Sequence, residues 1–240
     1  MKSINHLQLH HLQAVIFDMD GVLVDTEPIH LQAFEHFLQE KKVTFNAQDL
    51  HALIGYSVRD NMETINRTYL KDRPIDVDEG VRQRNAIYMD LIHNEQLKPI
   101  SGIIDIIDLC INHNVITALA SSSTRKQIEA ILDNLQNHPD YDLQLRSVFK
   151  TTVSGDDVKH KKPAPDIYQK TVTQLGIKPS HCLAIEDSQA GVLSAKAAGL
   201  YCIGINNLYN NHQKLQTADA VVDSPPEIVQ WMFDNEPWRP

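Results

Sequence analysis

Short, continuous apolar runs recur along the chain and are separated by segments with helical spacing. The runs lie at residues 13–18, 115–120, 182–185, 200–205 and 220–222, with a weaker one at 151–153. Apolar runs of this length are typical of strands that are buried on both faces, as in a parallel sheet. Helical patterns lie between them, at residues 101–112, 124–134 and 188–198, with another that residues 162–165 introduce and Gly176 ends. This alternation predicts an α/β fold whose parallel sheet is covered by helices on both faces.

Capping residues indicate where these helices begin and end. Ser101 and Ser188 are placed to cap two helix N-termini, and either Ser123 or Thr124 can cap the helix between them. Gly176 is expected to end the helix that precedes it, because glycine readily adopts the left-handed conformation found at helix C-termini.

Residues 28–99 have a different pattern. They contain no convincing strand and predict four helices, at about 28–41, 47–53, 58–71 and 77–96. The block interrupts an α/β pattern that resumes after it. We therefore expect an α/β core formed by residues 1–27 and 100–240, with an all-helical domain inserted at residues 28–99.

The overall charge restricts the classes of partner. The 240 residues include 22 Lys and Arg against 31 Asp and Glu, a formal net charge of −9. Nucleic acids and anionic membranes require basic surfaces, so neither is an expected partner. The helical block is nearly balanced, with nine basic and eleven acidic residues, so most of the excess acid lies elsewhere.

The chain carries no signal for export. The first 13 residues lack an apolar stretch, so we expect no secretory signal, and no segment approaches the apolar length of a membrane span. The cysteines Cys110, Cys182 and Cys202 are odd in number and widely spaced, which favours reduced core thiols over disulfides. The expected location is the cytoplasm.

Reactive polar residues follow three of the predicted strands, and ligands in open α/β sheets gather at such carboxyl ends. Asp18 and Asp20 point the same way if the chain stays extended, and their repulsion would be relieved by a divalent cation. One carboxylate would then be free to act as a nucleophile. Taken alone, such a pair is weak evidence, because a solvated strand end is its more common explanation.

The other strand ends leave similar alternatives open. The serines at 121–123 can bind a phosphate oxygen or simply cap a helix. Glu186 and Asp187 offer oxygen ligands to a hard cation, or form a charged strand end beside a helix N-terminus. Lys162 lies before a helix start, where a cation is disfavoured, so it is either solvated or directed at an anion.

The order of these groups along the chain resembles the four motifs of the haloacid dehalogenase superfamily of phosphohydrolases. The matching segments are residues 17–27, 118–123, 162–168 and 185–191. Within the superfamily the chain is most similar to the β-phosphoglucomutase-like group, whose helical cap follows the first motif. The resemblance implies a Rossmann-like core and assigns residues 28–99 to the cap.

The resemblance also implies roles for the site residues. Asp18 would be the nucleophile that forms an aspartyl-phosphate, and Asp20 the general acid and then the base. Mg²⁺ would be held by Asp18, the backbone carbonyl of Asp20 and Asp187, with Glu186 nearby.

Phosphate and substrate contacts follow from the same resemblance. Ser121 and the Ser122 N–H would bind phosphoryl oxygens, and Lys162 would offset their charge. In the cap, the loop at residues 55–59 is expected to close over the site, and Arg59 either binds a second anionic group or is a solvated cation at a helix start. Further substrate candidates, each equally explained by surface or packing roles, are Glu27, His30 and Arg84.

The implied function is a monomeric Mg²⁺-dependent phosphatase that hydrolyses a small phosphorylated metabolite, expected to be a sugar phosphate. A β-phosphoglucomutase would use the same residues and is the main alternative. The segment 56–58 is one residue longer than its counterpart in the mutases, which favours the phosphatase. A non-catalytic protein that binds phosphorylated metabolites is the remaining alternative.

Overall fold

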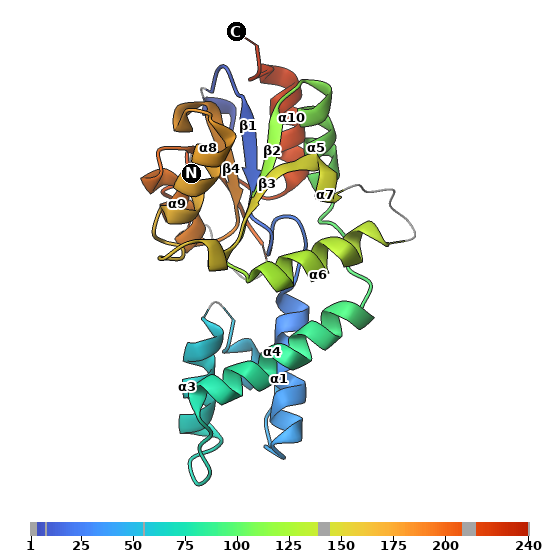
Figure 1. The fold of residues 1–240 in the computed structure, drawn as a ribbon, viewed down its shortest axis with the longest axis vertical. Helices are drawn as coiled ribbons and strands as arrows, with labels where there is room; N and C mark the ends of the chain where they lie inside the picture. Colours follow the sequence, from blue (N-terminus) through green and yellow to red (C-terminus); the bar gives the residue numbers. More distant parts are fainter. Residues whose placement is uncertain (1–3, 8, 55, 139–144, 208–214, 240) are drawn as a thin grey trace. The chain divides into compact units, whose positions relative to one another are not determined.

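The computed structural model describes residues 4–7, 9–54, 56–138, 145–207 and 215–239. The chain forms two compact units (Figure 1). We call Met1–Asp25 together with Leu97–Pro240 the core unit, and Thr26–Gln96 the helical unit.

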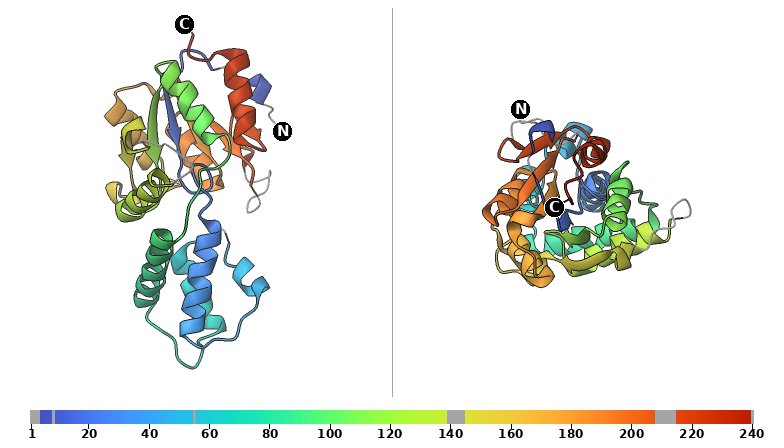
Figure 2. Two further views of the ribbon diagram at one scale, coloured as in Figure 1. Left: turned by 90° about the vertical axis from the view of Figure 1, so that its right-hand side faces the viewer. Right: turned by 90° about the horizontal axis from the view of Figure 1, so that it is seen from above.

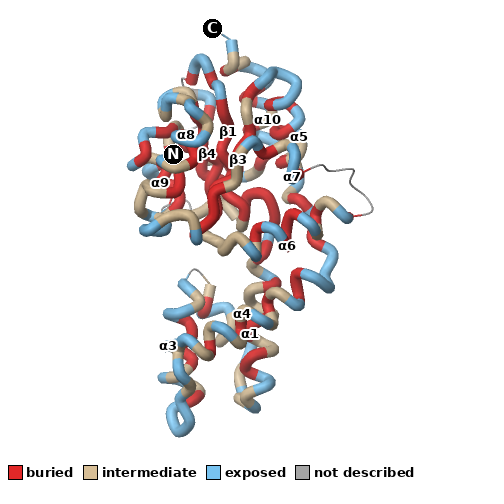
Figure 3. The backbone as a smooth tube through the Cα atoms, viewed as in Figure 1, coloured by how far each residue is buried: buried red, intermediate tan, exposed pale blue. Residues whose placement is uncertain are grey.

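A six-stranded parallel sheet forms the centre of the core unit, with the strand order β3-β2-β1-β4-β5-β6. The strands are β1 (Ala14–Phe17), β2 (Ile116–Ala120), β3 (Phe149–Val153), β4 (Cys182–Glu186), β5 (Tyr201–Ile205) and β6 (Ala220–Val222). Strands β1 and β4 are buried along their whole length (Figure 3), as continuous apolar runs require. The predicted α/β fold with a parallel sheet is confirmed.

Helices cover both faces of this sheet. They are α5 (Ile103–Asn112), α6 (Arg125–Gln136), α7 (Leu145–Val148), α8 (Asp166–Leu175), α9 (Gln189–Ala197) and α10 (Pro225–Asn235). Helices α5 and α10 pack together on one face, and α8 and α9 pack together on the other (Figures 1 and 2). Short 3₁₀ turns lie at Ile4–His6, Gly155–Asp157 and Pro179–His181.

Three of the predicted helix ends are formed as expected. Thr124 caps α6 and Ser188 caps α9, and each side chain accepts a hydrogen bond from the backbone N–H three residues further on. Gly176 ends α8 with a φ of 69°, in the left-handed region.

The predicted cap at Ser101 is wrong. The N-cap of α5 is Gly102, which has a φ of 85° and provides no side-chain cap. A Cβ atom at Gly102 would lie 2.8 Å from the Cδ atom of Pro226, so the close approach of the α10 N-terminus leaves no room for a side chain at this N-cap. That contact is tertiary, and the local sequence does not contain it.

The helical unit contains α1 (Glu27–Glu40), α2 (Ala47–His51), α3 (Val58–Thr68) and α4 (Val77–Asn94). Helices α1 and α3 both pack against α4. Their apolar faces share one buried cluster, formed by Phe34, Phe37, Leu38, Leu53, Met62, Ile65 and Leu70. Within residues 26–54 and 56–96 the backbone forms no strand, as predicted.

The strand register determines which side chains meet at the carboxyl edge of the sheet. Phe17, the last residue of β1, is paired with Leu119 of β2 and with Ile185 of β4. The residues that follow these three positions therefore leave the sheet at the same edge. None of the described helices has the length and apolar composition needed to cross a membrane.

Candidate active site

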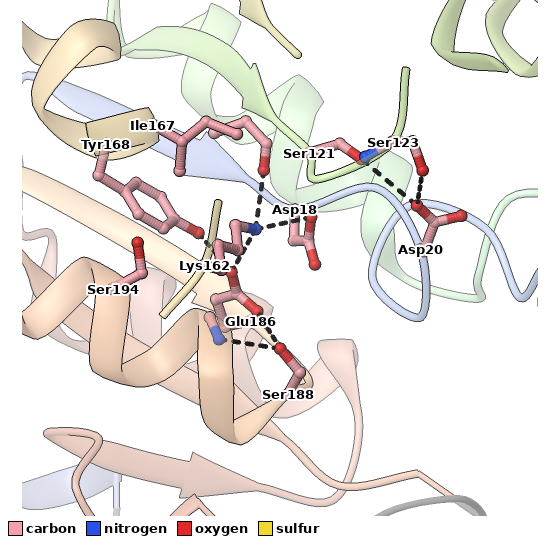
Figure 4. A network of polar contacts seen from close by, with 12 residues as sticks. Asp18, Asp20, Ser121, Ser123, Lys162, Ile167, Tyr168, Glu186, Ser188 and Ser194 are labelled. Atoms are coloured by element: carbon pink, nitrogen blue, oxygen red, sulfur yellow. Dashed lines mark hydrogen bonds and ion pairs between the residues drawn. The ribbon is translucent and has the colours of Figure 1, made fainter. Parts of the chain in front are cut away.

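Polar side chains from three strand ends meet at this edge (Figure 4). Asp18 follows β1, Ser121 follows β2 and Glu186 is the last residue of β4, and all three are buried. The Asp18 backbone N–H donates a hydrogen bond to the Ile185 carbonyl at 3.0 Å, which holds Asp18 against β4.

The Lys162 ammonium contacts groups at the ends of three strands. Its Nζ atom lies 2.9 Å from Asp18 Oδ1 and 2.6 Å from Glu186 Oε1, and it donates to the Ala120 carbonyl at 2.9 Å. Burial favours the neutral amine, but the carboxylates of Asp18 and Glu186 outweigh this effect and raise the pKa of Lys162. The lysine is therefore a buried cation directed at two anions, and it is not solvated.

Glu186 is held by further donors. The Tyr168 hydroxyl donates to Oε1 at 2.6 Å, and the Ser188 hydroxyl donates to Oε2 at 3.2 Å. A Cβ atom on Gly191 would lie within 2.0 Å of the Glu186 carboxylate, so the glycine leaves the space that this side chain fills. Buried charges of this kind are stable only when they are paired and hydrogen-bonded.

Three carboxylates form an acidic cluster beside Lys162. Asp18, Glu186 and Asp187 each offer an oxygen atom within 4.8 Å of the other two. Asp187 Oδ2 accepts a hydrogen bond from Asn207 Nδ2 at 2.7 Å. The same oxygen lies against Gly21, where a Cβ atom would be only 2.0 Å away.

The cluster carries more negative charge than one lysine offsets. Burial, followed by the charge of Glu186, raises the pKa of Asp18 to about 7, although Lys162 opposes the shift. Burial, with the charges of Asp18 and Glu186, also raises the pKa of Asp187 well above its usual value. Hard carboxylate oxygens that repel one another are the donor set that Mg²⁺ prefers, so these residues fit that ion.

Asp20 lies on the other side of Asp18, next to β2 (Figure 4). Its Oδ2 atom accepts hydrogen bonds from the Ser123 hydroxyl at 2.8 Å and from the Ser121 hydroxyl at 3.3 Å. The Ser123 N–H in turn donates to Ser121 Oγ at 3.0 Å. The two carboxylates of the Asp18–Asp20 pair therefore have separate surroundings.

The structure brings most of the predicted site residues together in the core unit. They are Asp18, Asp20, Ser121, Lys162, Glu186 and Asp187. Ser122 lies in the same loop as Ser121, and its carbonyl accepts a hydrogen bond from Lys161 Nζ at 3.1 Å.

The remaining candidates lie in the helical unit, where Arg84 is fully buried. Its guanidinium packs over the rings of Phe34 and Tyr88 and donates to the His30 carbonyl at 2.9 Å. Burial lowers the pKa of Arg84 to about 10. The His30 ring stacks on Tyr88 with 4.3 Å between the ring centroids.

The other two candidates in the helical unit are Arg59 and Glu27. Arg59 forms an ion pair with Asp78, and both side chains are more than half exposed. Glu27 is the first residue of α1 and is partly buried. In the predicted loop at residues 55–59, Gly55 lies outside the described residues, and Tyr56 is 67% exposed.

Four contact residues were not predicted from the sequence. Tyr168 had no predicted site role, and Ser123 was a candidate phosphate binder or helix cap whose hydrogen bond to Asp20 was not predicted. Lys161 and Asn207 had no assignment, although both flank predicted motifs or strand ends. Position beside a strand end is the one signal that could have identified Asn207.

Comparison with known proteins places this geometry in a family. The model of the family described as haloacid dehalogenase-like hydrolase matches residues 15–205. Protein CbbY from Rhodobacter capsulatus is 30% identical over 212 residues, which cover 87% of this chain and 91% of that protein. The phosphorylated carbohydrates phosphatase of Thermotoga maritima is 30% identical, with 91% and 96% covered. The β-phosphoglucomutase of Bacillus subtilis is 29% identical, with 94% and 95% covered.

Solved structures of related proteins match the fold of this chain. The crystal structure of CbbY from Rhodobacter sphaeroides in complex with phosphate has a TM-score of 0.76 at 27% identity and covers 90% of this chain and 96% of that one. A variant of the same protein in complex with xylulose-(1,5)bisphosphate has a TM-score of 0.74 at 27% identity, covering 89% and 94%. The protein is thus an enzyme that belongs to the haloacid dehalogenase-like hydrolase family, as its motifs predicted.

Proposed function

We propose that the protein is a Mg²⁺-dependent phosphatase that hydrolyses a small phosphorylated sugar through an aspartyl-phosphate on Asp18. One observation carries this proposal: the Asp18 carboxylate is held 2.9 Å from the Lys162 ammonium, inside an acidic cluster suited to a divalent cation. A carboxylate can attack an anionic phosphoryl group only where nearby cations offset the charge of both.

Asp18 and Asp20, the two carboxylates of the first motif, have different roles in the proposed reaction. Asp18 attacks phosphorus and forms an acyl phosphate, while Asp20 gives its proton to the leaving oxygen. Asp20 then takes a proton from water as that water attacks the same phosphorus and releases Asp18. The serine hydroxyls that contact Asp20 place it beside the phosphate-binding loop, where the leaving oxygen must lie.

Neighbouring residues hold the phosphoryl group and the ion. The Ser121 hydroxyl and the Ser122 N–H donate to phosphoryl oxygens, and Lys162 offsets their charge. Asp18, Asp187 and the Asp20 backbone carbonyl would hold Mg²⁺, which lowers the repulsion between the nucleophile and the phosphoryl oxygens. Glu186 already accepts hydrogen bonds at both oxygens and supports the cluster from beside it.

We assign substrate choice to the helical block at residues 28–99, acting as a cap on the core of residues 1–27 and 100–240. The sugar is suggested by two relatives, a phosphorylated carbohydrates phosphatase and a protein solved with xylulose-(1,5)bisphosphate. Among the cap candidates, the Arg59 side chain is more than half exposed, as substrate contact requires, and Glu27 is partly buried. Arg84 is fully buried and donates to the carbonyl of His30, which is partly buried, and this contact favours packing roles for both. We expect a cytoplasmic monomer.

The second candidate function is a β-phosphoglucomutase, favoured by the identity with the Bacillus subtilis enzyme. The mutase would return the phosphoryl group to a sugar hydroxyl in place of water, with the same residues. Product analysis separates the two. β-Glucose 1-phosphate with a bisphosphate primer yields glucose 6-phosphate from a mutase, and glucose with inorganic phosphate from a phosphatase.

Hydrolysis of an aryl phosphate and a panel of sugar phosphates, with and without Mg²⁺, tests the main proposal. Asp18→Asn should lower kcat by at least about a thousandfold, because amide nitrogen and oxygen cannot form the acyl phosphate. Asp105→Asn removes an exposed carboxylate from α5 and is the matched control. Turnover by Asp18→Asn near the wild-type rate would remove Asp18 as the nucleophile.

A further inference from the structure

The end of β2 and the loop that follows it accept hydrogen bonds from one neighbouring segment, residues 155–162. The Gly155 N–H donates to the Ser123 carbonyl at 2.9 Å, and Lys161 Nζ donates to the Ser122 carbonyl at 3.1 Å. Lys162 Nζ donates to the Ala120 carbonyl at 2.9 Å. Two carbonyls of the loop, and that of the last residue of β2, therefore accept hydrogen bonds from residues 155–162.

The contact made by Lys161 has a consequence on the opposite side of the peptide. The Ser122 carbonyl and the Ser123 N–H belong to one planar peptide group and point in opposite directions. Fixing the carbonyl therefore fixes the N–H, which donates to Ser121 Oγ at 3.0 Å. A cationic donor on the carbonyl also polarises the peptide, and this strengthens its N–H as a donor.

The Ser121 hydroxyl is thereby left with its proton to donate. A hydroxyl has one proton and can accept at its oxygen. Ser121 Oγ accepts from the Ser123 N–H, and its own proton is directed at Asp20 Oδ2, 3.3 Å away. A phosphoryl oxygen bound in the proposed reaction would be a stronger acceptor than this long contact.

The packing around Lys161 depends on the glycine at position 155. A Cβ atom on Gly155 would lie 2.3 Å from the Ser122 carbonyl oxygen and 2.9 Å from both Cε and Nζ of Lys161. The absence of a side chain at Gly155 therefore leaves the space through which Lys161 reaches the loop. Lys159, two residues earlier, is also exposed, and in the described part of the chain it has no hydrogen-bond or ion-pair partner.

We infer that Lys161 is a positioning residue for the phosphoryl group. Its ammonium holds the Ser122–Ser123 peptide so that the Ser123 N–H fixes Ser121 Oγ and directs the Ser121 proton at a phosphoryl oxygen. The inference rests on the proposed phosphatase function. Lys161 acts through Ser121 and touches no reacting atom.

Kinetics of three variants test this role. Lys161→Met should lower kcat/KM by about 5- to 10-fold, the effect of losing one exposed charge-assisted hydrogen bond. The loss should be the same for an aryl phosphate and for the preferred sugar phosphate, because both share the phosphoryl group. Lys161→Arg keeps a cationic donor and should retain most of the activity. Lys159→Met removes the same charge from the same segment and should match the wild type.

A double-mutant cycle distinguishes positioning from general electrostatics. Ser121→Ala removes the group through which Lys161 acts, so adding Lys161→Met to Ser121→Ala should cause little further loss. Independent, multiplicative losses would overturn the inference. So would an equal loss in Lys159→Met, or a loss that differs between the two substrates, since the latter indicates direct substrate contact.

Failure of the proposed function gives a different result. If the wild-type protein hydrolyses no phosphate ester, the phosphatase proposal fails, and the dissociation constant of inorganic phosphate in the presence of Mg²⁺ tests Lys161 instead. Lys161→Met should then weaken phosphate binding by a similar factor, with Lys159→Met unchanged. Phosphate binding that is equal in Lys161→Met and the wild type would overturn the inference.

Discussion

Glu186 illustrates how a single buried residue organises the site. Its side chain has no solvent exposure, yet it accepts hydrogen bonds from Lys162, Tyr168 and Ser188. A buried carboxylate is tolerated only with such partners. The pairing also keeps Lys162 charged and beside Asp18, so Glu186 contributes to the site without needing to contact substrate.

Tyr168→Phe tests this arrangement at the smallest scale. The substitution removes one donor to Glu186 Oε1 but leaves the other two donors in place, so we expect the free energy of unfolding to fall by about 1–3 kcal/mol. Urea denaturation measures the change. Tyr201→Phe, at a partly buried tyrosine in β5, is the matched control and should cost less. Equal losses in both variants would contradict a specific role for the Tyr168 hydroxyl.

Most of the site residues predicted from the sequence follow strand ends, and Lys162 precedes a helix start. Asp18 and Glu186 lie at the edge of the sheet because continuous apolar runs end there. Tyr168 and Ser123 could not be assigned their contacts in the same way. A tyrosine on an apolar helix face has a packing role in any fold, and only the approach of β4 gives its hydroxyl an acceptor.

At the scale of elements, the turn after β1 must bring Asp187 close to the backbone. Gly21 has a φ of 80° and lies against Asp187 Oδ2, so two separate requirements exclude a side chain there. Gly176 shares only the first requirement: its φ is 69°, and no atom lies within 4 Å of the position of a Cβ atom.

Comparing Gly21→Ala with Gly176→Ala therefore separates backbone strain from the close approach to Asp187. Gly176→Ala should cost about 1–2 kcal/mol, the penalty for an L-residue in the left-handed region. Gly21→Ala should cost at least about 1 kcal/mol more and should weaken Mg²⁺ binding, because its Cβ displaces Asp187. Denaturant unfolding and Mg²⁺ titration measure the two effects. A Gly21→Ala variant with wild-type Mg²⁺ affinity would argue against Asp187 as a ligand.

Helices α1 and α4 are joined by a polar contact inside the helical unit. Burial, followed by the charge of Arg84, holds the pKa of His30 well below its ordinary value. The folded protein therefore binds fewer protons at His30 than the unfolded chain once the pH falls below about 6.5. The stability contributed by a neutral His30 is complete above that pH and is lost as the pH decreases.

Unfolding at about pH 5 and about pH 7.5 tests this dependence. The wild-type protein should lose more stability on acidification than His30→Gln, which cannot be protonated. His36→Gln, on the same helix, should behave like the wild type. Groups that face His30 are Arg84 and Tyr88 from α4, and their substitution is not needed for the comparison. Identical pH profiles for wild type and His30→Gln would contradict the shift.

Most helices and strands were predictable because their hydrophobic pattern is local. The features that were missed depend on packing between elements that are distant in the sequence. The four helices of the helical unit match their amphipathic spacing closely. Helix α10 had no predicted counterpart, and the cap of α5 was misplaced because Pro226 of α10 packs against Gly102. Arg84 was a substrate candidate because it resembles a basic cap residue of the mutases, and only the fold shows its guanidinium packed over the rings of Phe34 and Tyr88.

For the whole molecule, the net charge of −9 does not oppose an anionic substrate once the charges are located. Asp18, Glu186 and Asp187 share one small region with a single buried lysine, Lys162. A bound divalent cation would reverse the local field there. Part of the excess acid thus lies in this cluster, and the remaining negative charge still argues against a nucleic-acid partner.

Mg²⁺ should therefore act as a stabilising ligand of the folded protein. At a concentration about 100-fold above its Kd, a ligand adds about 2.7 kcal/mol, which raises the Tm of a chain of this size by about 5 °C or more. Thermal unfolding in MgCl₂, against NaCl of equal ionic strength, measures this gain.

Asp18→Asn should raise the stability of the Mg²⁺-free protein and reduce the stability gained from Mg²⁺. Without Mg²⁺ the variant should be more stable than the wild type, because a neutral amide replaces a carboxylate whose pKa is raised to about 7 by burial and Glu186. Lys162 keeps its contacts with Glu186 and the Ala120 carbonyl in this variant. With Mg²⁺ the variant should gain less than the wild type, since one ligand is lost. Equal Mg²⁺ stabilisation of both proteins would place the ion elsewhere and would separate the acidic cluster from cation binding.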